Sequence, residues 1–326
     1  MRALVTGGNG FIGSFLIEKL LEKKYLVRCM IRKTSNLRWI ENLPVEFVVG
    51  DLLREDTLRS VVKDVDLVIH LGGLTKARNE ADYYKVNAEG TENLLKAIET
   101  SGTTIQKFVL ISSLAAAGPG EPDQPISEER APAPITPYGK SKAEAEKITL
   151  SHSEKIPVTI LRPPPVYGPR DTDVFEMFKT VKMGIKPRVS GPPRFTSVIH
   201  VDDLAEGILL ASEAAESSGQ IYFLCEDEAY SWEAISDIIQ QAFGNKAIKI
   251  TVPAFLLDGI AGAAEMVARL SGKAAVINHY KVLEMKQLSW VCDNSRAKKE
   301  LGFTPRILFR EGAKSTADWY LREGWL

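Results

Sequence analysis

The 326-residue sequence has little cysteine, little histidine and almost no net charge. Its three cysteines are far apart and odd in number, so we expect reduced thiols in the core of a protein from a reducing compartment. Neither the cysteines nor the four histidines show the spacing of metal ligands, which argues against a metal centre. The formal net charge of −1 at pH 7 gives no basis for a nucleic-acid or anionic-lipid partner.

The sequence shows neither the pattern of a targeting segment nor that of a membrane span. A strand-like run occupies residues 1–6, and the apolar stretch behind it is broken by glycines and then by Glu18 and Lys19, unlike a signal peptide. The most apolar later segment, residues 254–270, contains three charged side chains and falls short of a membrane span. We therefore expect a soluble, cytoplasmic protein with a small-molecule substrate, and a homodimer is compatible with the sequence.

Short β-branched runs alternate with helix-period segments through the first half of the chain. We expect strands at residues 3–6, 26–31, 45–49, 67–70, 108–112 and 158–161, and helices at residues 11–23, 80–100 and 138–151. Strands that alternate with helices predict an α/β fold with a doubly wound parallel sheet of the Rossmann type.

The composition changes after Arg162. A proline-rich loop is followed by short mixed elements and by a mainly helical C-terminal third, in which the apolar helix expected at residues 255–268 is either a pocket wall or core packing. This pattern indicates a smaller domain that covers the ligand edge of the sheet. We assign a dinucleotide-binding Rossmann domain to residues 1–170 with about 197–225, and a substrate-binding domain to residues 171–196 and 226–326.

Three glycines, Gly7, Gly10 and Gly13, lie between the first expected strand and the first expected helix. At this spacing the backbone can turn sharply, approach a pyrophosphate closely and direct the free N–H groups of the helix start at the anion. A simple tight turn is the alternative, but the repeated strand–helix units favour a dinucleotide site. Phe11 and Ile12, at the start of the helix, belong to the predicted site.

The end of the second strand bears on which dinucleotide binds. An acidic residue there would accept from a ribose 2′-hydroxyl, but residues 27–33 contain no carboxylate. Arg32, helped by Lys33 or Arg28, can instead pair with a 2′-phosphate, which predicts NADP rather than NAD; a solvated strand end is the alternative.

The end of the third strand offers a contact for the adenine. Asp51, followed by Leu52, is placed to accept from the adenine amino group, with a helix N-cap as the alternative role for the carboxylate.

Among the nine tyrosines only Tyr138 has a lysine four residues later, and this spacing puts Lys142 on the same helix face. The pair follows the fifth strand and a long loop, at the sheet edge where ligands of α/β proteins bind. A cation about 4 Å from a phenol supplies roughly the 4 kcal/mol that would bring its pKa from about 10 to near neutrality, although burial opposes this. Tyr138 is therefore the candidate general acid/base, and an exposed helical pair is the alternative.

Two serines, Ser112 and Ser113, end the fifth strand at the same edge. A hydroxyl there can hydrogen-bond a substrate carbonyl and polarise it. The residues alone do not choose between the two serines, and a turn-forming role is the alternative for both.

Together these residues resemble the extended short-chain dehydrogenase/reductase family, also called the NAD-dependent epimerase/dehydratase family. Besides the glycine turn, the resemblance covers nearly the whole chain through the segments 86–95, 138–142, 161–169, 199–205, 301–305, 311–312 and 318–320.

The resemblance implies roles that the residues alone do not give. The family's catalytic serine lies five residues before a glycine, as Ser113 does before Gly118, so Ser113 joins Tyr138 and Lys142 as a catalytic residue. Asn87 matches a structural asparagine of the family. Further cofactor contacts are implied for the nicotinamide carboxamide at Pro163 and Val166, and for the middle of the cofactor at Leu71, Gly72 and Gly73.

The resemblance leaves the reaction open, because the family contains simple carbonyl reductases as well as nucleotide-sugar epimerases and dehydratases. Nucleotide-sugar enzymes usually present an arginine to the diphosphate shortly before the segment 199–205; here that position is Thr196, with Arg194 nearby. Arg32 resembles the NADP-dependent dihydroflavonol-reductase and hydroxysteroid-dehydrogenase branches. We predict an NADP-dependent oxidoreductase that interconverts a carbonyl and an alcohol on a mainly apolar small molecule, with Tyr138 as general acid/base. The alternatives are a nucleotide-sugar epimerase or dehydratase and a non-catalytic NADP-binding regulator.

Overall fold

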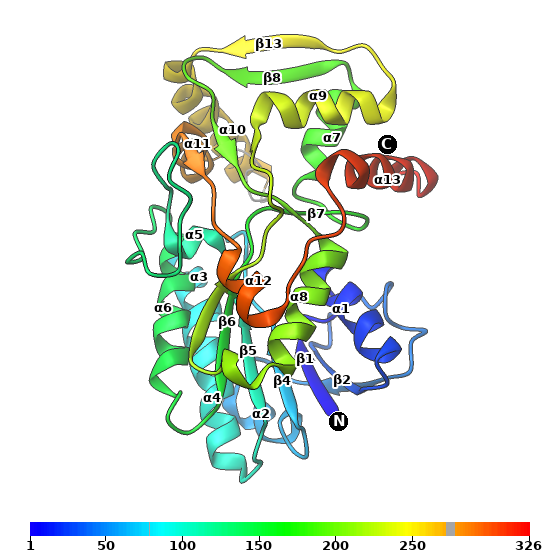
Figure 1. The fold of residues 1–326 in the computed structure, drawn as a ribbon, viewed down its shortest axis with the longest axis vertical. Coiled ribbons are helices and arrows are strands. Elements are labelled where there is room, and N and C mark those ends of the chain that lie inside the picture. Colours follow the sequence, from blue (N-terminus) through cyan, green and yellow to red (C-terminus); the bar gives the residue numbers. More distant parts are fainter. Residues whose placement is uncertain (78, 272–277) are drawn as a thin grey trace.

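A seven-stranded parallel sheet forms the centre of the computed structural model, which describes residues 1–77, 79–271 and 278–326 (Figure 1). The strand order is β11-β6-β5-β4-β1-β2-β3. The strands are β1 (Arg2–Thr6), β2 (Leu26–Ile31), β3 (Val45–Val49), β4 (Leu67–His70), β5 (Lys107–Ile111), β6 (Val158–Arg162) and β11 (Gln220–Phe223). The first six coincide with the expected strands to within a residue or two, and β11 adds an edge strand that the sequence pattern did not indicate.

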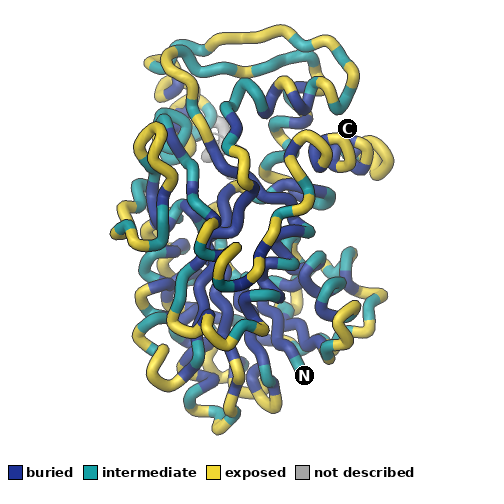
Figure 2. The backbone as a smooth tube through the Cα atoms, in the orientation of Figure 1, coloured by how far each residue is buried: buried dark blue, intermediate teal, exposed yellow. Residues whose placement is uncertain are grey.

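Helices cover both faces of the sheet and bury a separate apolar core on each. On one face α1 (Phe11–Glu22) packs against α8 (Val201–Glu213). On the other face α4 (Gly90–Ser101) packs between α2 (Glu55–Val61) and α6 (Pro137–Ser151). Figure 2 shows the buried backbone concentrated in the sheet and in these helices. The predicted doubly wound Rossmann fold is therefore confirmed.

The register of the strands brings their carboxyl ends to one edge. Thr6 pairs with His70, His70 pairs with Leu110, and Ile111 pairs with Leu161, so the last residues of β1, β4, β5 and β6 lie side by side. The loops that follow these four strands therefore open at the same edge, which is where ligands bind in open α/β sheets.

The helix expected at residues 80–100 is three consecutive helical segments. It begins as α3 (Glu80–Tyr83), continues as a π-helical segment, η1 (Tyr84–Glu89), and ends as α4. Periodicity cannot distinguish a π-helical turn from an α-helical one over six residues, and such turns often occur at functional sites.

Most of the rest of the chain lies beyond the carboxyl edge of the sheet and is mainly helical, with short strands between the helices (Figure 1). The helices are α5 (Leu114–Ala117), α7 (Phe175–Lys182), α9 (Trp232–Phe243), α10 (Leu257–Ser271), α11 (His279–Lys286), α12 (Ser295–Leu301) and α13 (Phe309–Arg322), with 3₁₀ turns η2 (Ala215–Ser217) and η3 (Ala254–Leu256). The exceptions to this placement are α12, which packs beside α8 and β11, and η2, which lies at the opposite edge, beside Lys107 at the start of β5. The short strands form three small sheets. In two of them β7 (Val166–Tyr167) pairs with β10 (Ile199–His200), and β13 (Ile248–Val252) pairs with β8 (Ile185–Val189). In the third, β9 (Phe195–Thr196) lies between β12 (Tyr230–Ser231) and β14 (Ser289–Trp290).

The apolar helix α10 packs on α11, where Leu257 and Ala261 meet Val282. No helix in the described part of the chain is both long enough and apolar enough to cross a membrane.

Candidate active site at the carboxyl edge of the sheet

The glycines after β1 form a turn that tolerates no side chain at two of its positions. Gly7 has φ +71°, and a Cβ there would lie 2.9 Å from the backbone nitrogen of Gly72. A Cβ on Gly13 would lie only 2.3 Å from the carbonyl oxygen of Gly7. The turn therefore brings the end of β1, the start of α1 and the loop after β4 into direct backbone contact.

The start of α1 has the properties of an anion site. Its N-cap is Gly10, which has no side chain to satisfy the first backbone N–H groups, and its first turn contains no acidic residue. Phe11 and Ile12, half-buried, begin the helix. Free N–H groups at a helix N-terminus attract a phosphate, so this turn fits the pyrophosphate of a dinucleotide.

A chain of hydrogen bonds behind the turn links the loop after β4 to η1. Gly72 N donates to Thr6 Oγ1 (3.0 Å), and the Thr6 hydroxyl donates to His70 Nδ1 (2.6 Å), because the proton of the neutral ring is on Nε2. His70 Nε2 then donates to Thr91 Oγ1 (3.0 Å), which donates to the carbonyl of Asn87 (2.6 Å). Burial and the charge of Lys142 lower the pKa of His70 to about 3, so the ring is neutral and structural.

Asn87 fastens the loop after β4 to α6. Its Oδ1 accepts from Leu74 N (2.7 Å), and its Nδ2 donates to the Leu74 carbonyl (3.1 Å) and to Ser141 Oγ (2.9 Å). A Cβ on Gly73 would lie 2.9 Å from Asn87 Oδ1. The glycines at 72 and 73 and the helix that carries Tyr138 are thus held at fixed positions relative to each other.

Tyr138 lies in the first turn of α6, which Thr136 caps by accepting from Gly139 N (3.2 Å). Its ring packs edge-on against Tyr83, with the centroids 6.0 Å apart. Burial raises the pKa of Tyr138 to about 12; a hydrogen bond with Ser113 opposes the rise, while the charges of Glu284 and Asp173 add to it. The direction is opposite to the lowering that the sequence suggested, because burial outweighs the favourable contacts.

Lys142 lies one turn further along α6 and is buried. Its Nζ donates to the carbonyl of Ile111 (2.7 Å), the last residue of β5. Burial lowers the pKa of Lys142 to about 8, and the charge of Glu146 opposes this. The ammonium is thus fixed at the end of β5, immediately before the two serines.

The structure separates the two serines. Ser112 is buried and its hydroxyl donates to Glu146 Oε1 (2.5 Å). Ser113 is half-buried, caps α5 by accepting from Ala115 N (3.1 Å), and lies close enough to the Tyr138 phenol to oppose the rise of its pKa. Only Ser113 therefore shares a site with the phenol, because the hydroxyl of Ser112 is already used.

The two arginines of β2 and its following loop differ in availability. Arg32 follows β2 and is exposed, and its backbone nitrogen donates to Ser35 Oγ (2.9 Å). Arg28, suggested as a helper, is buried and pairs with Glu46 through two bonds of 3.0 Å, while it also donates to two backbone carbonyls. The suggested role for Arg28 is therefore wrong, since its guanidinium is fully engaged on the side of β3.

Asp51 follows β3 and does not cap a helix, because α2 starts at Glu55 with Arg54 as its N-cap. Its Oδ1 accepts from Leu53 N (2.9 Å) within a turn. Leu52 is buried, and a Cβ on Gly72 would lie 3.2 Å from its Cδ1, so it lies beside the loop after β4.

The proline-rich loop after β6 meets the segment that follows β5. Leu114 N donates to the carbonyl of Pro163 (2.8 Å), and Val166 lies in β7, which pairs with β10. Pro163 is buried and Val166 half-buried. Most of the site residues predicted from the sequence therefore lie in the loops after β1, β4, β5 and β6 or at the start of α6. The exceptions are Arg32, Asp51 and Leu52, which follow β2 and β3 at the same edge.

Of the two residues considered as diphosphate ligands, Thr196 has no charge, and Arg194 directs its guanidinium at backbone carbonyls. Thr196, in β9, is buried and donates to the Ser197 carbonyl (2.9 Å). The guanidinium of Arg194 donates to the carbonyls of Val189 (3.3 Å), Pro192 (3.2 Å) and Ser190 (3.3 Å), within its own strand connection.

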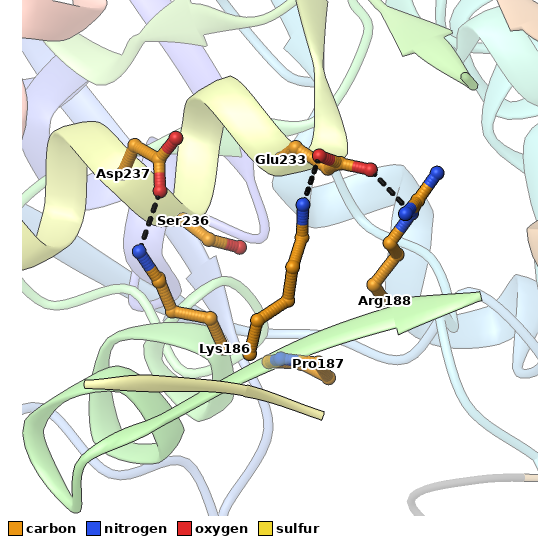
Figure 3. Close-up of a pocket in the computed structure, with 7 residues that line it drawn as sticks. Lys186, Pro187, Arg188, Glu233, Ser236 and Asp237 are labelled. Atoms are coloured by element: carbon orange, nitrogen blue, oxygen red, sulfur yellow. Dashed lines mark hydrogen bonds and ion pairs between the residues drawn. The ribbon is translucent and has the colours of Figure 1, made fainter. Parts of the chain in front are cut away.

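A separate small pocket lies between β8 and α9, away from these residues (Figure 3). Its charged side chains pair with one another: Lys186 with Asp237 (2.8 Å), and Arg188 (2.5 Å) and Lys249 (2.6 Å) with Glu233. Each of these charged side chains is held in an ion pair inside the pocket, so we assign the pocket no role.

Comparison with known proteins agrees with the geometry. A UDP-glucose 4-epimerase of Vibrio cholerae is 27% identical over 98% of this chain and 95% of its own. The 4-hydroxy-2-methyl-3-oxo-4-farnesyl-3,4-dihydroquinoline-1-oxide ketoreductase of Stigmatella aurantiaca is 26% identical over 96% and 94%. The crystal structure of gox2253 superposes with a TM-score of 0.83 at 29% identity, covering 99% of this chain and 98% of that one.

The family pattern described as the NAD dependent epimerase/dehydratase family matches residues 3–225, which include the glycine turn, Ser113, Tyr138 and Lys142. Enzymes with this pattern bind a nicotinamide dinucleotide in a Rossmann fold, as the turn after β1 and the open edge of the sheet require. The chain therefore belongs to the NAD-dependent epimerase/dehydratase family and is an enzyme of the extended short-chain dehydrogenase/reductase class.

Proposed function

We propose that this enzyme is an NADP-dependent oxidoreductase that interconverts a carbonyl and an alcohol on a mainly apolar small molecule. The observation that carries the proposal is the proximity of the Ser113 hydroxyl to the Tyr138 phenol, whose pKa it helps to hold down, with the buried ammonium of Lys142 one turn away at the same sheet edge. A hydroxyl pair of this kind can bind a carbonyl oxygen from two directions and transfer one proton to it.

In this proposal, each part of the cofactor is bound by a different loop at the carboxyl edge of the sheet. The backbone of Gly7, Gly10 and Gly13 takes the pyrophosphate, with Phe11 and Ile12 beside it. Arg32 pairs with the 2′-phosphate, Asp51 and Leu52 contact the adenine, and the remaining contacts come from Leu71, Gly72, Gly73, Pro163 and Val166. When bound, the nicotinamide supplies or accepts the hydride.

The proton step uses three side chains. Ser113 holds the substrate oxygen, and Tyr138 Oη donates a proton to it during reduction or accepts one during oxidation. Lys142 stabilises the resulting phenolate by its charge and also holds the nicotinamide ribose. Asn87 keeps α6 against the loop after β4, so these groups stay aligned.

The preference for an apolar substrate rests on the two positions considered for a diphosphate ligand, neither of which is arranged as a clamp in the described part of the chain. Burying a diphosphate without a paired cation would cost several kcal/mol, which apolar walls cannot offset. Thr196 has no charge, and Arg194 is engaged with backbone carbonyls. The relative from Stigmatella aurantiaca, whose name specifies a farnesyl-bearing ketone, supports the same substrate class. We assign the binding of this apolar substrate to residues 171–196 and 226–326 of the chain.

A nucleotide-sugar epimerase or dehydratase is the second candidate, favoured by the similarity to the Vibrio cholerae epimerase. Two measurements separate the candidates: NADPH oxidation with panels of ketones, aldehydes and UDP- or TDP-sugars, and calorimetric titration with UDP, TDP and GDP. We expect turnover with an apolar carbonyl compound and no micromolar nucleotide binding. Micromolar binding of any of the three nucleotides contradicts the proposal and supports the epimerase function.

A further inference from the structure

A buried ion pair lies directly behind Lys142. Arg162, at the end of β6, donates from Nε to Glu146 Oε1 (2.9 Å) and from Nη2 to Glu146 Oε2 (2.6 Å). Ser112 donates to the same carboxylate, and all three side chains are buried. Glu146 lies one turn after Lys142 on α6, so the two residues share a helix face.

Stability alone does not account for this pair. Two buried charges lose their hydration, and such a pair often adds little net stability compared with an apolar packing of the same volume. In addition, Nη1 of Arg162 is one of the buried polar atoms that have no hydrogen-bond partner in the described part of the chain. The position of the pair points to a role in the neighbouring site.

The contacts of α6 hold the end of β5 at two consecutive residues. Lys142 donates to the carbonyl of Ile111, and Glu146 accepts from the hydroxyl of Ser112. The next residue is Ser113, which lies beside the Tyr138 phenol and lowers its pKa. The distance between strand end and helix therefore depends on Glu146 as well as on Lys142.

We propose that Glu146 is a positioning residue that fixes the end of β5 against α6 and supplies the negative charge that keeps the buried Lys142 protonated. The inference rests on the proposed function, since it assumes that the ammonium of Lys142 acts on Tyr138 and the cofactor. Glu146 touches neither the substrate nor the cofactor.

The other charged or titratable groups around Lys142 do not replace this charge. His70, on β4, is neutral because Lys142 and burial lower its pKa to about 3. Burial and nearby carboxylates raise the pKa of Tyr138 to about 12, so its phenol is also uncharged near neutral pH. Arg162, on β6, is positive and is neutralised by Glu146 itself. Burial lowers the pKa of Lys142 to about 8, and Glu146 is the carboxylate that opposes this.

The test compares Glu146→Gln with Ser112→Ala. Glu146→Gln removes the charge but keeps an oxygen that can accept from Ser112, whereas Ser112→Ala removes this contact to the strand end and keeps the charge. For each protein, NADPH affinity is measured by calorimetry without substrate, and kcat/KM is measured with the best substrate, from pH 6 to pH 10. We expect wild-type affinity and turnover to fall above about pH 8, and Glu146→Gln to move that fall at least about one pH unit lower. In Ser112→Ala the fall should occur at the same pH as in the wild type.

The outcomes separate the two proposals. If affinity and turnover fall at the same pH in the wild type and in Glu146→Gln, the inference about Glu146 is wrong, while the proposed function is not affected. The absence of any fall between pH 7 and pH 10 in the wild type contradicts the role of Lys142 in the proposed function. If Glu146→Gln does not fold, the double variant Glu146→Gln/Arg162→Met leaves no unpaired buried charge and should show a shift in the same direction. An unshifted profile in that variant likewise overturns the inference.

Discussion

Replacing Gly13 by alanine should abolish dinucleotide binding through one backbone contact. The added Cβ would lie 2.3 Å from the carbonyl oxygen of Gly7, whereas non-bonded atoms of this size prefer roughly 3.5 Å. The obstruction is backbone, which cannot rotate away as a side chain can. The turn must therefore move by about 1 Å, which takes N–H groups out of the narrow range of a good hydrogen bond.

The magnitude follows from the number of bonds displaced. Each N–H bond to a charged phosphate contributes about 1.5 to 3 kcal/mol, so losing two weakens binding roughly 10²- to 10⁴-fold. Overpacking at the same site should destabilise the fold by about 1 to 3 kcal/mol. Calorimetric titration with NADPH measures the first effect, and urea unfolding measures the second.

Gly10→Ala is the matched control in the same turn. Its added Cβ would lie 3.2 Å from the same carbonyl oxygen, so a shift of only a few tenths of an ångström accommodates it. We expect binding within about tenfold of the wild type, since no N–H group needs to leave hydrogen-bond range. If Gly13→Ala binds NADPH as well as Gly10→Ala does, the backbone approach at this turn has no part in holding the cofactor.

Three further predictions concern other side chains of the site. Arg32→Ala should erase most of the preference for NADPH over NADH, a loss of about 1.5 to 3 kcal/mol in paired titrations, and equal wild-type affinities would refute the assignment. Tyr138→Phe should keep NADPH affinity while lowering turnover about a hundredfold or more, and unchanged turnover would move the proton transfer to another group. His70 is neutral in the folded state, with a pKa of about 3 against 6.5 unfolded, so stability is greatest above pH 6.5 and falls as the pH decreases. Urea unfolding should therefore show a wild-type loss between pH 6.5 and pH 5 that exceeds that of His70→Gln by about 1.5 kcal/mol, and equal losses would contradict a neutral buried ring.

The parts of the site predictable from sequence are those with local signals. The glycine spacing at 7, 10 and 13 and the four-residue spacing from Tyr138 to Lys142 each lie within one turn or helix. Short β-branched runs between helix-period segments likewise located β1 to β6, because the strands of a sheet covered on both faces are mainly apolar.

The parts that could not be predicted depend on contacts between distant residues. Arg28 looked like a free cation near a strand end, yet Glu46 and two carbonyls from the next crossover surround it. Without the family resemblance the sequence does not separate Ser112 from Ser113, and the physical difference between them comes from Glu146, more than thirty residues later, which binds the Ser112 hydroxyl. A third example is a contact between two cysteines. Cys225 and Cys292 are far apart in sequence, but Cys225 Sγ donates to the carbonyl of Cys292 (3.4 Å).

The protonation state of Tyr138 bears on the direction of the proposed reaction. With a pKa of about 12, roughly one phenol in 10⁵ is ionised at pH 7, so the proton needed for reducing a carbonyl is already on Oη. Oxidation of an alcohol would first require that proton to leave, against burial and against the charges of Glu284 and Asp173. These carboxylates lie on α11 and before α7, outside the glycine turn and the Tyr138–Lys142 helix. The charges of these elements beyond the sheet edge therefore favour the protonated phenol, which is the form that the proposed reduction of a carbonyl uses.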